Sequence, residues 1–300
     1  MSRSITQPTR RTLLRAGAAA PVAYAAGSLL STAPANGARR SSAIADLERT
    51  YGATIGVAAW NVRTGERLMH RGRTRFPLCS VFKPLVAANI LRDRDRHGQT
   101  LDRRVFYPRR DVLEYAPVTR THVKDGMLVR ELCEAAITVS DNTAGNLLLR
   151  EVGGPQGLTD FFRSLGDKVT RLDRWETALN SAVPGDPRDT TTPHSIASLM
   201  VKLLVGHALN HRDRHLLRGW MLANQTSDDK FRAGLPQGWR LADKTGSGSY
   251  GTSNDVGVAW SPSGDPVVIA ALTRRDEEGA ETTDPAVHAD IAALVAKRLG

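Results

Sequence analysis

The sequence is poor in the features that mark nucleic-acid-binding, disulfide-stapled and membrane proteins. Only two cysteines occur in 300 residues, Cys79 and Cys133, too few for a disulfide framework. Aromatic residues make up 5% of the chain and no run interleaves them with basic residues, so the formal net charge of +10 is not evidence for a nucleic-acid partner. After the first forty residues, no stretch is long and apolar enough to span a bilayer.

The first forty residues do not have the pattern of a folded domain. The paired arginines of TRRTLL precede a moderately apolar run at 16–30 and then small residues, which predicts an export signal in residues 1–38 rather than a membrane span. Paired arginines before two leucines resemble the twin-arginine signal, which exports folded proteins. Cleavage after Ala35 or Ala38 would lower the net charge to +6. We expect a secreted protein, extracellular or periplasmic, without a membrane anchor; the alternative is a basic tail.

The rest of the chain is strand-like at both ends and helix-like in the middle. The segments ATIGVAAWNV and ERLMHRG, separated by RTG, predict a hairpin after a helix from Ser41 to Gly52. Three later strands are predicted in WRLADKTG, SNDVGVAWSP and PVVIAALTRR. Helical periodicity predicts helices at residues 80–94, 129–138, 143–152, 156–165, 192–204, 212–223 and 286–299.

This order of elements predicts an α+β fold. The late strands are joined by short loops and should pair antiparallel. The two chain ends would then build one five-stranded antiparallel sheet flanked by helices. We expect one domain over residues 39–300, with 39–75 and 222–300 as its α/β part and 76–221 as an all-helical insertion. A crevice between two such parts is a common place for a site.

The stretch FPLCSVFKPL places Ser80 three residues before Lys83 in apolar surroundings. Two residues at this spacing project from the same face of a helix. One explanation is that Ser80 caps a helix and Lys83 extends to solvent. The other is that Lys83 activates Ser80 as a nucleophile. Pro84 indicates that the helix starts close by, because proline is tolerated in the first turn.

Two later motifs favour the chemical explanation. The Ser-Asp-Asn of VSDNTAG, residues 140–142, lies between two predicted helices, and alone would be explained by a turn and a helix cap. The Lys-Thr-Gly of ADKTGSGSYG, residues 244–246, ends a predicted strand. Ser-x-x-Lys, Ser-Asp-Asn and Lys-Thr-Gly in this order are typical of class A β-lactamases and penicillin-binding proteins. The sequence resembles class A β-lactamases from the first hairpin to the last helix.

A fourth segment, RLDRWETALN, distinguishes these two families. It resembles the omega loop of class A enzymes, with Glu176 matching the deacylating carboxylate and Asn180 the amide that helps hold its water. Penicillin-binding proteins lack this loop. Arg174 and Asp189 match the ion pair that closes it. Thr177 stands where the family often has proline after a cis bond, so this departure leaves the geometry of the loop open.

The resemblance implies hydrolysis of the β-lactam amide of penicillins and cephalosporins through an acyl-enzyme, and hence antibiotic resistance. Ser80 would attack the carbonyl after giving its proton to Lys83 or, through a water, to Glu176. Ser140 would relay the proton to the ring nitrogen, and Glu176 would activate the water that frees Ser80. The backbone N–H groups of Ser80 and Ser247 would form the oxyanion hole. The chemistry needs no cofactor and no metal.

The resemblance also implies the residues that bind substrate. Class A enzymes commonly place an additional arginine near the substrate carboxylate, on the strand after Lys-Thr-Gly, where this chain has Ser253. Lys230 is our candidate substitute, and the alternative is that it is a solvated loop lysine. The other substrate-binding residues implied by position are Tyr115, Asn142, Asn180, Lys244, Thr245, Gly246 and Ser247.

The cysteines are not expected to pair. Some class A carbapenemases join the cysteine before the nucleophile to a position that is Gly248 here, and another family bridge joins the position of Cys133 to that of Ala87. Ala87 lies eight residues beyond Cys79, about 12 Å along a helix. Cys79 is therefore expected to be too far from Cys133 for a disulfide.

The histidines His207, His211 and His215 recur every four residues, a spacing that also occurs in metal sites. Gly206 and the segment ALNHRDR indicate a break between helices at this point. The three side chains therefore need not share a face, and we do not expect a metal.

Two other functions would use the same motifs. A DD-peptidase or transpeptidase acting on cell-wall peptides would need Ser80, Lys83, Ser140 and Lys244 but not Glu176. A covalent penicillin sensor would be acylated and stop. In each case the partner is a small molecule or peptide, and we expect a monomer that binds no nucleic acid.

Overall fold

The computed structural model describes residues 35–95 and 97–300 of the chain. Residues Asn36 to Gly300 form one compact unit. The export signal predicted for residues 1–38, with its paired arginines, lies almost wholly outside the described residues. Within those residues, no helix has the length and apolar character needed to cross a membrane.

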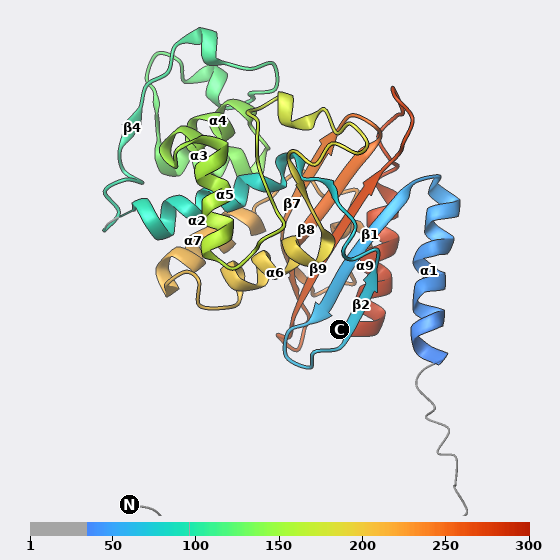
Figure 1. The fold of residues 1–300 in the computed structure, drawn as a ribbon. Coiled ribbons are helices and arrows are strands. Elements are labelled where there is room, and N and C mark those ends of the chain that lie inside the picture. Colours follow the sequence, from blue (N-terminus) through green and yellow to red (C-terminus); the bar gives the residue numbers. More distant parts are fainter. Residues whose placement is uncertain (1–34, 96) are drawn as a thin grey trace, which may run out of the picture. The chain divides into compact units, whose positions relative to one another are not determined.

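Five strands pair into one antiparallel sheet in the order β2-β1-β9-β8-β7 (Figure 1). They are β1 (Thr54–Asn61), β2 (Arg67–His70), β7 (Arg240–Gly248), β8 (Thr252–Trp260) and β9 (Pro266–Arg274). The last strand lies beside the first, with Ala58 opposite Ala270. β7 is an edge strand, and its pairing with β8 sets Ser247 opposite Ser253. The predicted five-stranded sheet built from both chain ends is confirmed.

The helices predicted after residue 120 are all present, with ends within two residues of the prediction. The first helix begins earlier than predicted, at Ala35 instead of Ser41. The described α-helices are α1 (Ala35–Tyr51), α2 (Phe82–Asn89), α3 (Val129–Thr138), α4 (Asn142–Glu151), α5 (Gly154–Ser164), α6 (Pro193–Leu204), α7 (His211–Leu222), α8 (Phe231–Gly234) and α9 (Ala286–Leu299).

Some short elements were not predicted, because two residues or one turn carry no hydrophobic period. They are the helix α8 and the strand pairs β3 (Phe76–Pro77) with β6 (Thr190–Thr191) and β4 (Arg104–Val105) with β5 (Met127–Leu128). The first of these pairs joins the segment before Ser80 to the end of the omega loop. It therefore ties two parts of the site together.

The two faces of the sheet are buried against different helices, because successive side chains of a strand point to opposite faces. Val267, Ile269 and Ala271 of β9 cluster with Val287 of α9. The residues between them, such as Ala270, belong to a second cluster that contains side chains of α2 and α6. Figure 1 shows α9 and the helical part on opposite sides of the strands. The sheet thus separates the two hydrophobic cores.

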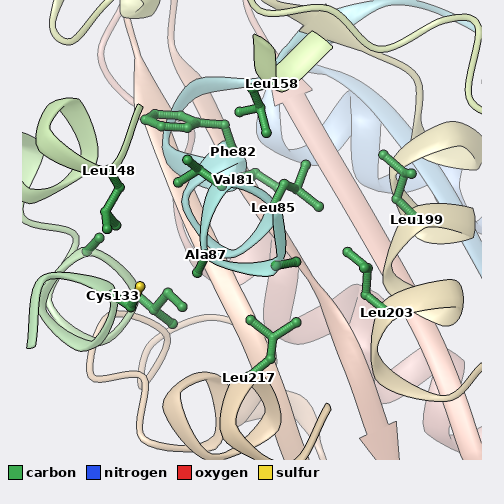
Figure 2. Close-up of a cluster of buried hydrophobic side chains, with 14 of the residues drawn as sticks. Val81, Phe82, Leu85, Ala87, Cys133, Leu148, Leu158, Leu199, Leu203 and Leu217 are labelled. Carbon is green, nitrogen blue, oxygen red and sulfur yellow. The ribbon is translucent and has the colours of Figure 1, made fainter. Parts of the chain in front are cut away.

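Helix α2 is the centre of the helical part. All of its residues are buried, and apart from Lys83 and Asn89 they are apolar, as expected of a helix in the core. Figure 2 shows leucines of α4, α5, α6 and α7 and Cys133 of α3 arranged around Val81, Phe82, Leu85 and Ala87. Pro84 is the third residue of α2, where its missing N–H breaks no helical hydrogen bond. The start of the helix that Pro84 indicated is confirmed.

Both cysteines are free and buried, and burial raises the pKa of each thiol far above its usual range. We therefore predict that the native protein does not react with a thiol reagent at neutral pH, since neither a path nor a thiolate is present. After denaturation two equivalents of thiol should titrate, without a reductant. A native protein that reacts promptly, or a denatured one that releases thiol only after reduction, would contradict this.

Candidate active site

Ser80 lies in a short 3₁₀ helix, Cys79–Val81, that leads into α2. The residue before it, Cys79, has a φ of 46°, in the left-handed region that non-glycine residues rarely adopt. The Lys83 ammonium donates to Ser80 Oγ at 2.9 Å, and the Lys83 side chain is fully buried. Val81 rather than Ser80 precedes α2, and no side chain caps this helix. A cap and a solvent-exposed lysine therefore do not explain the pair.

The Lys83 ammonium lies among acceptors from separate parts of the chain. It donates to the carbonyl of Ser140 at 2.8 Å and to Asn142 Oδ1 at 2.7 Å, and it lies 3.3 Å from Glu176 Oε1. Burial lowers the pKa of Lys83, and the negative charge of Glu176 opposes that shift. A buried cation is tolerable only when such partners surround it.

Asp141 fixes the turn that carries Ser140 and Asn142. Its carboxylate is fully buried and accepts from the backbone N–H groups of Val118, Thr119 and Ala144, the last of which caps α4. Ser140 has a φ of 60°, again in the left-handed region. Asp141 thus serves as the structural residue of this motif, and its two neighbours point toward Lys83.

Glu176 is buried in the omega loop and faces Ser80. The Ser80 hydroxyl lies 3.4 Å from Glu176 Oε1, and Asn180 Nδ2 donates to Glu176 Oε2 at 2.6 Å. The bond between Glu176 and Thr177 is cis. Sequence reasoning missed Asn146, whose amide accepts from the Glu176 N–H and donates to the Glu176 carbonyl. Its position four residues after Asn142, on the same helix face, was the available signal.

The ends of the omega loop are held by one buried carboxylate. Asp189 is 1% exposed and accepts from the backbone N–H groups of Asp173 and Arg174 and from Arg174 Nε at 2.5 Å. The ion pair between Arg174 and Asp189 that the resemblance implied is present. Asp189 itself has a φ of 54°.

The edge strand β7 forms the opposite wall. Lys244 is fully buried, and its ammonium donates to Ser140 Oγ at 3.1 Å. Burial lowers the pKa of Lys244 well below its usual range, and the charge of Lys83 lowers it further. A Cβ at Gly246 would lie 3.3 Å from the Ser80 nitrogen, so the absent side chain lets this strand approach the backbone of Ser80. Thr245 shares a 2.5 Å hydrogen bond with Thr226.

The outer rim is open to solvent. Tyr115 is 53% exposed, and its carbonyl accepts from the Asn142 N–H. Ser249 donates its N–H to the Asn180 carbonyl, which links β7 to the omega loop. Beside this link is a hollow of about 480 Å³ lined by Thr177, Ala178, Asn180, Ser181, Gly248 and Ser249.

Lys230 directly precedes α8, and its side chain contacts β8. It is 7% exposed, and its ammonium donates to Ser253 Oγ at 3.0 Å and to the Asn254 carbonyl at 3.3 Å. The alternative of a solvated loop lysine is therefore wrong. Burial lowers the pKa of Lys230, and the nearby Asp255 opposes the shift.

Asn254 was also missed by sequence reasoning. Its side chain is fully buried and donates to the carbonyls of Pro77 and Leu78 at 2.9 and 3.3 Å. This amide joins β8 to the segment that immediately precedes Ser80. It gave no sequence signal, because its partners are backbone atoms more than 170 residues away.

The histidine repeat does not form a metal site. His211 and His215 lie on α7, whereas His207 precedes that helix. Across residues 35–95 and 97–300, no group of three or more His, Cys, Asp or Glu side chains could hold a metal ion.

Comparison with known proteins identifies the family. The model of the β-lactamase enzyme family matches residues 39–299. The chain belongs to this β-lactamase family. A β-lactamase of Streptomyces albus G is 48% identical over 316 aligned residues, covering 100% of both chains. The β-lactamase AST-1 of Nocardia asteroides is 46% identical and covers 97% of this chain and 96% of its own.

Solved structures of β-lactamases have the same fold. The Streptomyces albus G enzyme superimposes with a TM-score of 0.85 at 50% identity, covering 87% of this chain and 100% of the other. An ancestral class A β-lactamase gives 0.82 at 50% identity over 86% of this chain and 99% of its own. The fold of this β-lactamase is therefore that of class A, and the resemblance stated from the motifs is confirmed.

The hydrogen bonds that Asp189 accepts from the omega loop should contribute to the stability of this β-lactamase. Replacing Asp189 with alanine should lower the free energy of unfolding by roughly 2–4 kcal/mol, because the Arg174 guanidinium and two backbone N–H groups lose their acceptor. Urea denaturation measures the change. Asp189→Asn is the matched control, since asparagine tolerates the same backbone and keeps an acceptor oxygen. Equal unfolding midpoints for wild type and Asp189→Ala would contradict the assignment.

Proposed function

We propose that this protein hydrolyses the β-lactam amide of penicillins and cephalosporins through an ester on Ser80, and so confers resistance to them. The observation that carries the proposal is the position of the Glu176 carboxylate. It is buried beside both the Ser80 hydroxyl and the Lys83 ammonium, at 3.4 and 3.3 Å. A carboxylate in this place can hold and deprotonate a water next to an ester at Ser80 Oγ.

Acylation requires a base for the Ser80 proton, hydrogen-bond donors for the oxyanion and a proton donor for the ring nitrogen. Ser80 Oγ attacks the lactam carbonyl, and its proton passes to Lys83 in its neutral amine form, which the lowered pKa of Lys83 favours, or through a water to the Glu176 carboxylate. Both groups lie within reach of the hydroxyl. The N–H groups of Ser80 and Ser247 receive the developing oxyanion. The C–N bond of the ring then breaks, and Ser140, hydrogen-bonded to both Lys83 and Lys244, gives its proton to the ring nitrogen and regains one from Lys83.

Deacylation uses the omega loop. Glu176 takes a proton from a water, and the resulting hydroxide attacks the ester carbonyl. The ester C–O bond to Ser80 then breaks, and the proton passes from Glu176 to Ser80 Oγ, which restores both groups. Asn180, whose amide donates to Glu176 Oε2, helps hold that water. The Asn146 side chain hydrogen-bonds both the N–H and the carbonyl of Glu176. The carboxylate is therefore positioned before substrate arrives.

Substrate binding is assigned to the β7 wall and the rim. Residues 244–247 hold the substrate carboxylate, and Lys230 adds a positive charge from behind Ser253. Asn142 bonds the acylamino group, while Tyr115 forms the outer wall. The buried ammonium groups strengthen this recognition, because charges in a site shielded from water interact more strongly than exposed ones.

A DD-peptidase and a covalent penicillin sensor are the alternatives that the Ser80, Lys83 and Lys244 motifs alone would allow. Both would be acylated at Ser80, but neither needs a carboxylate beside the ester. Glu176 is buried and held by hydrogen bonds to Asn146 and Asn180. This arrangement favours an enzyme that hydrolyses the ester on Ser80.

Residues 1–38 are proposed to direct export of the protein by the twin-arginine route, and residues 39–300 to form its monomeric catalytic domain. The paired arginines and the small residues before Ala38 support this, and no helix of the described residues could span a membrane.

Glu176→Ala should trap the acyl-enzyme. With a chromogenic cephalosporin, kcat should fall on the order of 10²–10⁴-fold, because the general base of deacylation is gone. Intact-mass measurement after mixing with benzylpenicillin should show a gain equal to the whole penicillin, since ring opening releases no fragment. Ser80→Ala should show neither turnover nor mass gain.

Three outcomes of that experiment separate the candidates. Rapid turnover by wild type with a persistent adduct on Glu176→Ala supports the lactamase. A persistent adduct on the wild type itself would indicate the sensor or the peptidase. Unimpaired turnover by Glu176→Ala would remove Glu176 from the mechanism.

Lys230→Ala should raise KM for penicillins several-fold. The lowered pKa of Lys230 also predicts a pH effect: the ammonium is lost as the pH rises, and at a lower pH than for an exposed lysine. The KM of the wild type for penicillins should therefore increase as the pH is raised above neutral. Lys230→Arg stays charged and should remove the part of the rise that is due to this residue. If KM is unchanged in Lys230→Ala, the binding role is excluded.

A further inference from the structure

A fully buried histidine stands behind Lys230. His288 lies on α9, and its Nε2 is 3.0 Å from Ser253 Oγ. The same oxygen accepts from Lys230 Nζ, also at 3.0 Å. Ser253 is 0% exposed, so no solvent competes for its hydroxyl. Lys230, Ser253 and His288 therefore form one line of hydrogen bonds that joins α9, β8 and the residue before α8.

Which group donates in each of these hydrogen bonds follows from the protons that Lys230, Ser253 and His288 carry. The Lys230 ammonium can only donate, so Ser253 Oγ is its acceptor. Among the described residues, the Ser253 hydroxyl has no other neighbour than His288 to which it could donate. If His288 Nε2 accepts that proton, only Nδ1 of the ring is left without a partner. If Nε2 donated instead, both the hydroxyl proton and Nδ1 would be unpaired, which costs more.

The surroundings keep the imidazole neutral, as an acceptor must be. Burial lowers the pKa of His288 well below its usual range, and the positive charge of Lys230 lowers it further. The ring of Phe231 packs edge-on against the imidazole, with centroids 5.9 Å apart. No carboxylate forms an ion pair with His288 within the described part of the chain. The backbone of Ser253 favours the protonated ring, but burial and the charge of Lys230 outweigh it.

The Lys230 ammonium depends on this line for its position. Asp255 accepts from the Phe231 N–H at 3.2 Å, which anchors the backbone next to Lys230 but not the ammonium. The ammonium itself has two acceptors in the described residues, Ser253 Oγ and the carbonyl of Asn254. A Ser253 hydroxyl free to rotate would turn its proton toward Lys230 part of the time and weaken the shorter of these bonds.

We propose that His288 is a positioning residue for substrate recognition: it holds the Ser253 hydroxyl with its lone pair toward Lys230 and so keeps the Lys230 ammonium in place for the substrate carboxylate. The inference rests on the proposed function and extends it to a residue outside the motifs. Its chemistry is that of an orienting acceptor, and His288 itself touches no substrate.

The test compares His288→Leu with His288→Gln, using benzylpenicillin and steady-state kinetics. Leucine keeps the volume but removes the acceptor, so kcat/KM should fall about five-fold through KM while kcat stays within about two-fold, as expected for the loss of one hydrogen bond. Glutamine can offer an acceptor oxygen near the position of Nε2 and should restore KM. Val287→Ala, a buried neighbour on the same helix, controls for general destabilisation: it should lower the melting temperature without changing KM.

A double-mutant cycle decides whether His288 acts through Lys230. Lys230→Ala should raise KM, and adding His288→Leu to it should raise KM no further. If the two effects multiply, if His288→Gln behaves as His288→Leu, or if Val287→Ala raises KM equally, the positioning role is overturned. A wild type that turns over penicillin while His288→Leu keeps its KM would overturn this inference alone. A wild type that neither turns over nor is acylated by penicillin would overturn the proposed function as well.

Discussion

The structure depends on placing one ammonium group where water is excluded. Lys83 lies in the first turn of α2, a helix that is buried on all sides. Its charge is tolerable there only because a hydroxyl, a carbonyl, an amide oxygen and a carboxylate converge on it. These acceptors come from the 3₁₀ helix before α2, from residues 140–142 and from the omega loop. Stabilising the cation therefore also brings the reacting groups together.

The sheet supplies the second constraint. Alternate residues of β9 are divided between two cores, so the strands are fixed from both faces and β7 can lie as a rigid edge against the start of α2. Gly246 allows the close approach, and Asn254 ties β8 to the backbone before Ser80. The left-handed backbone at Cys79 and Ser140 is held in place by these neighbouring contacts.

What the sequence could predict depended on how local the information was. The strands, most of the helices and the Ser80–Lys83 pair follow from spacings of two to four residues, and they were correct. The first helix begins six residues earlier than predicted. The helix predicted for residues 80–94 is α-helical only over Phe82–Asn89, between a 3₁₀ turn and a π-helical turn. Asn146, Asn254 and His288 were missed because their partners lie in other elements and no local pattern marks them. Lys230 was ambiguous for the same reason: whether a loop lysine is solvated or buried depends on the strand it meets, here at Ser253. The cis bond at Thr177 likewise has no local signal once proline is absent.

The acceptors around Lys83 have a consequence for how the protein folds. Apart from Ser80, they are separated from it by 57 residues or more along the chain, so each can arrive only after a long loop has closed. The ammonium would therefore remain hydrated until most of the tertiary structure has formed. Catalytic competence should then be among the last properties gained during refolding, and recovered turnover can report on the completely assembled chain.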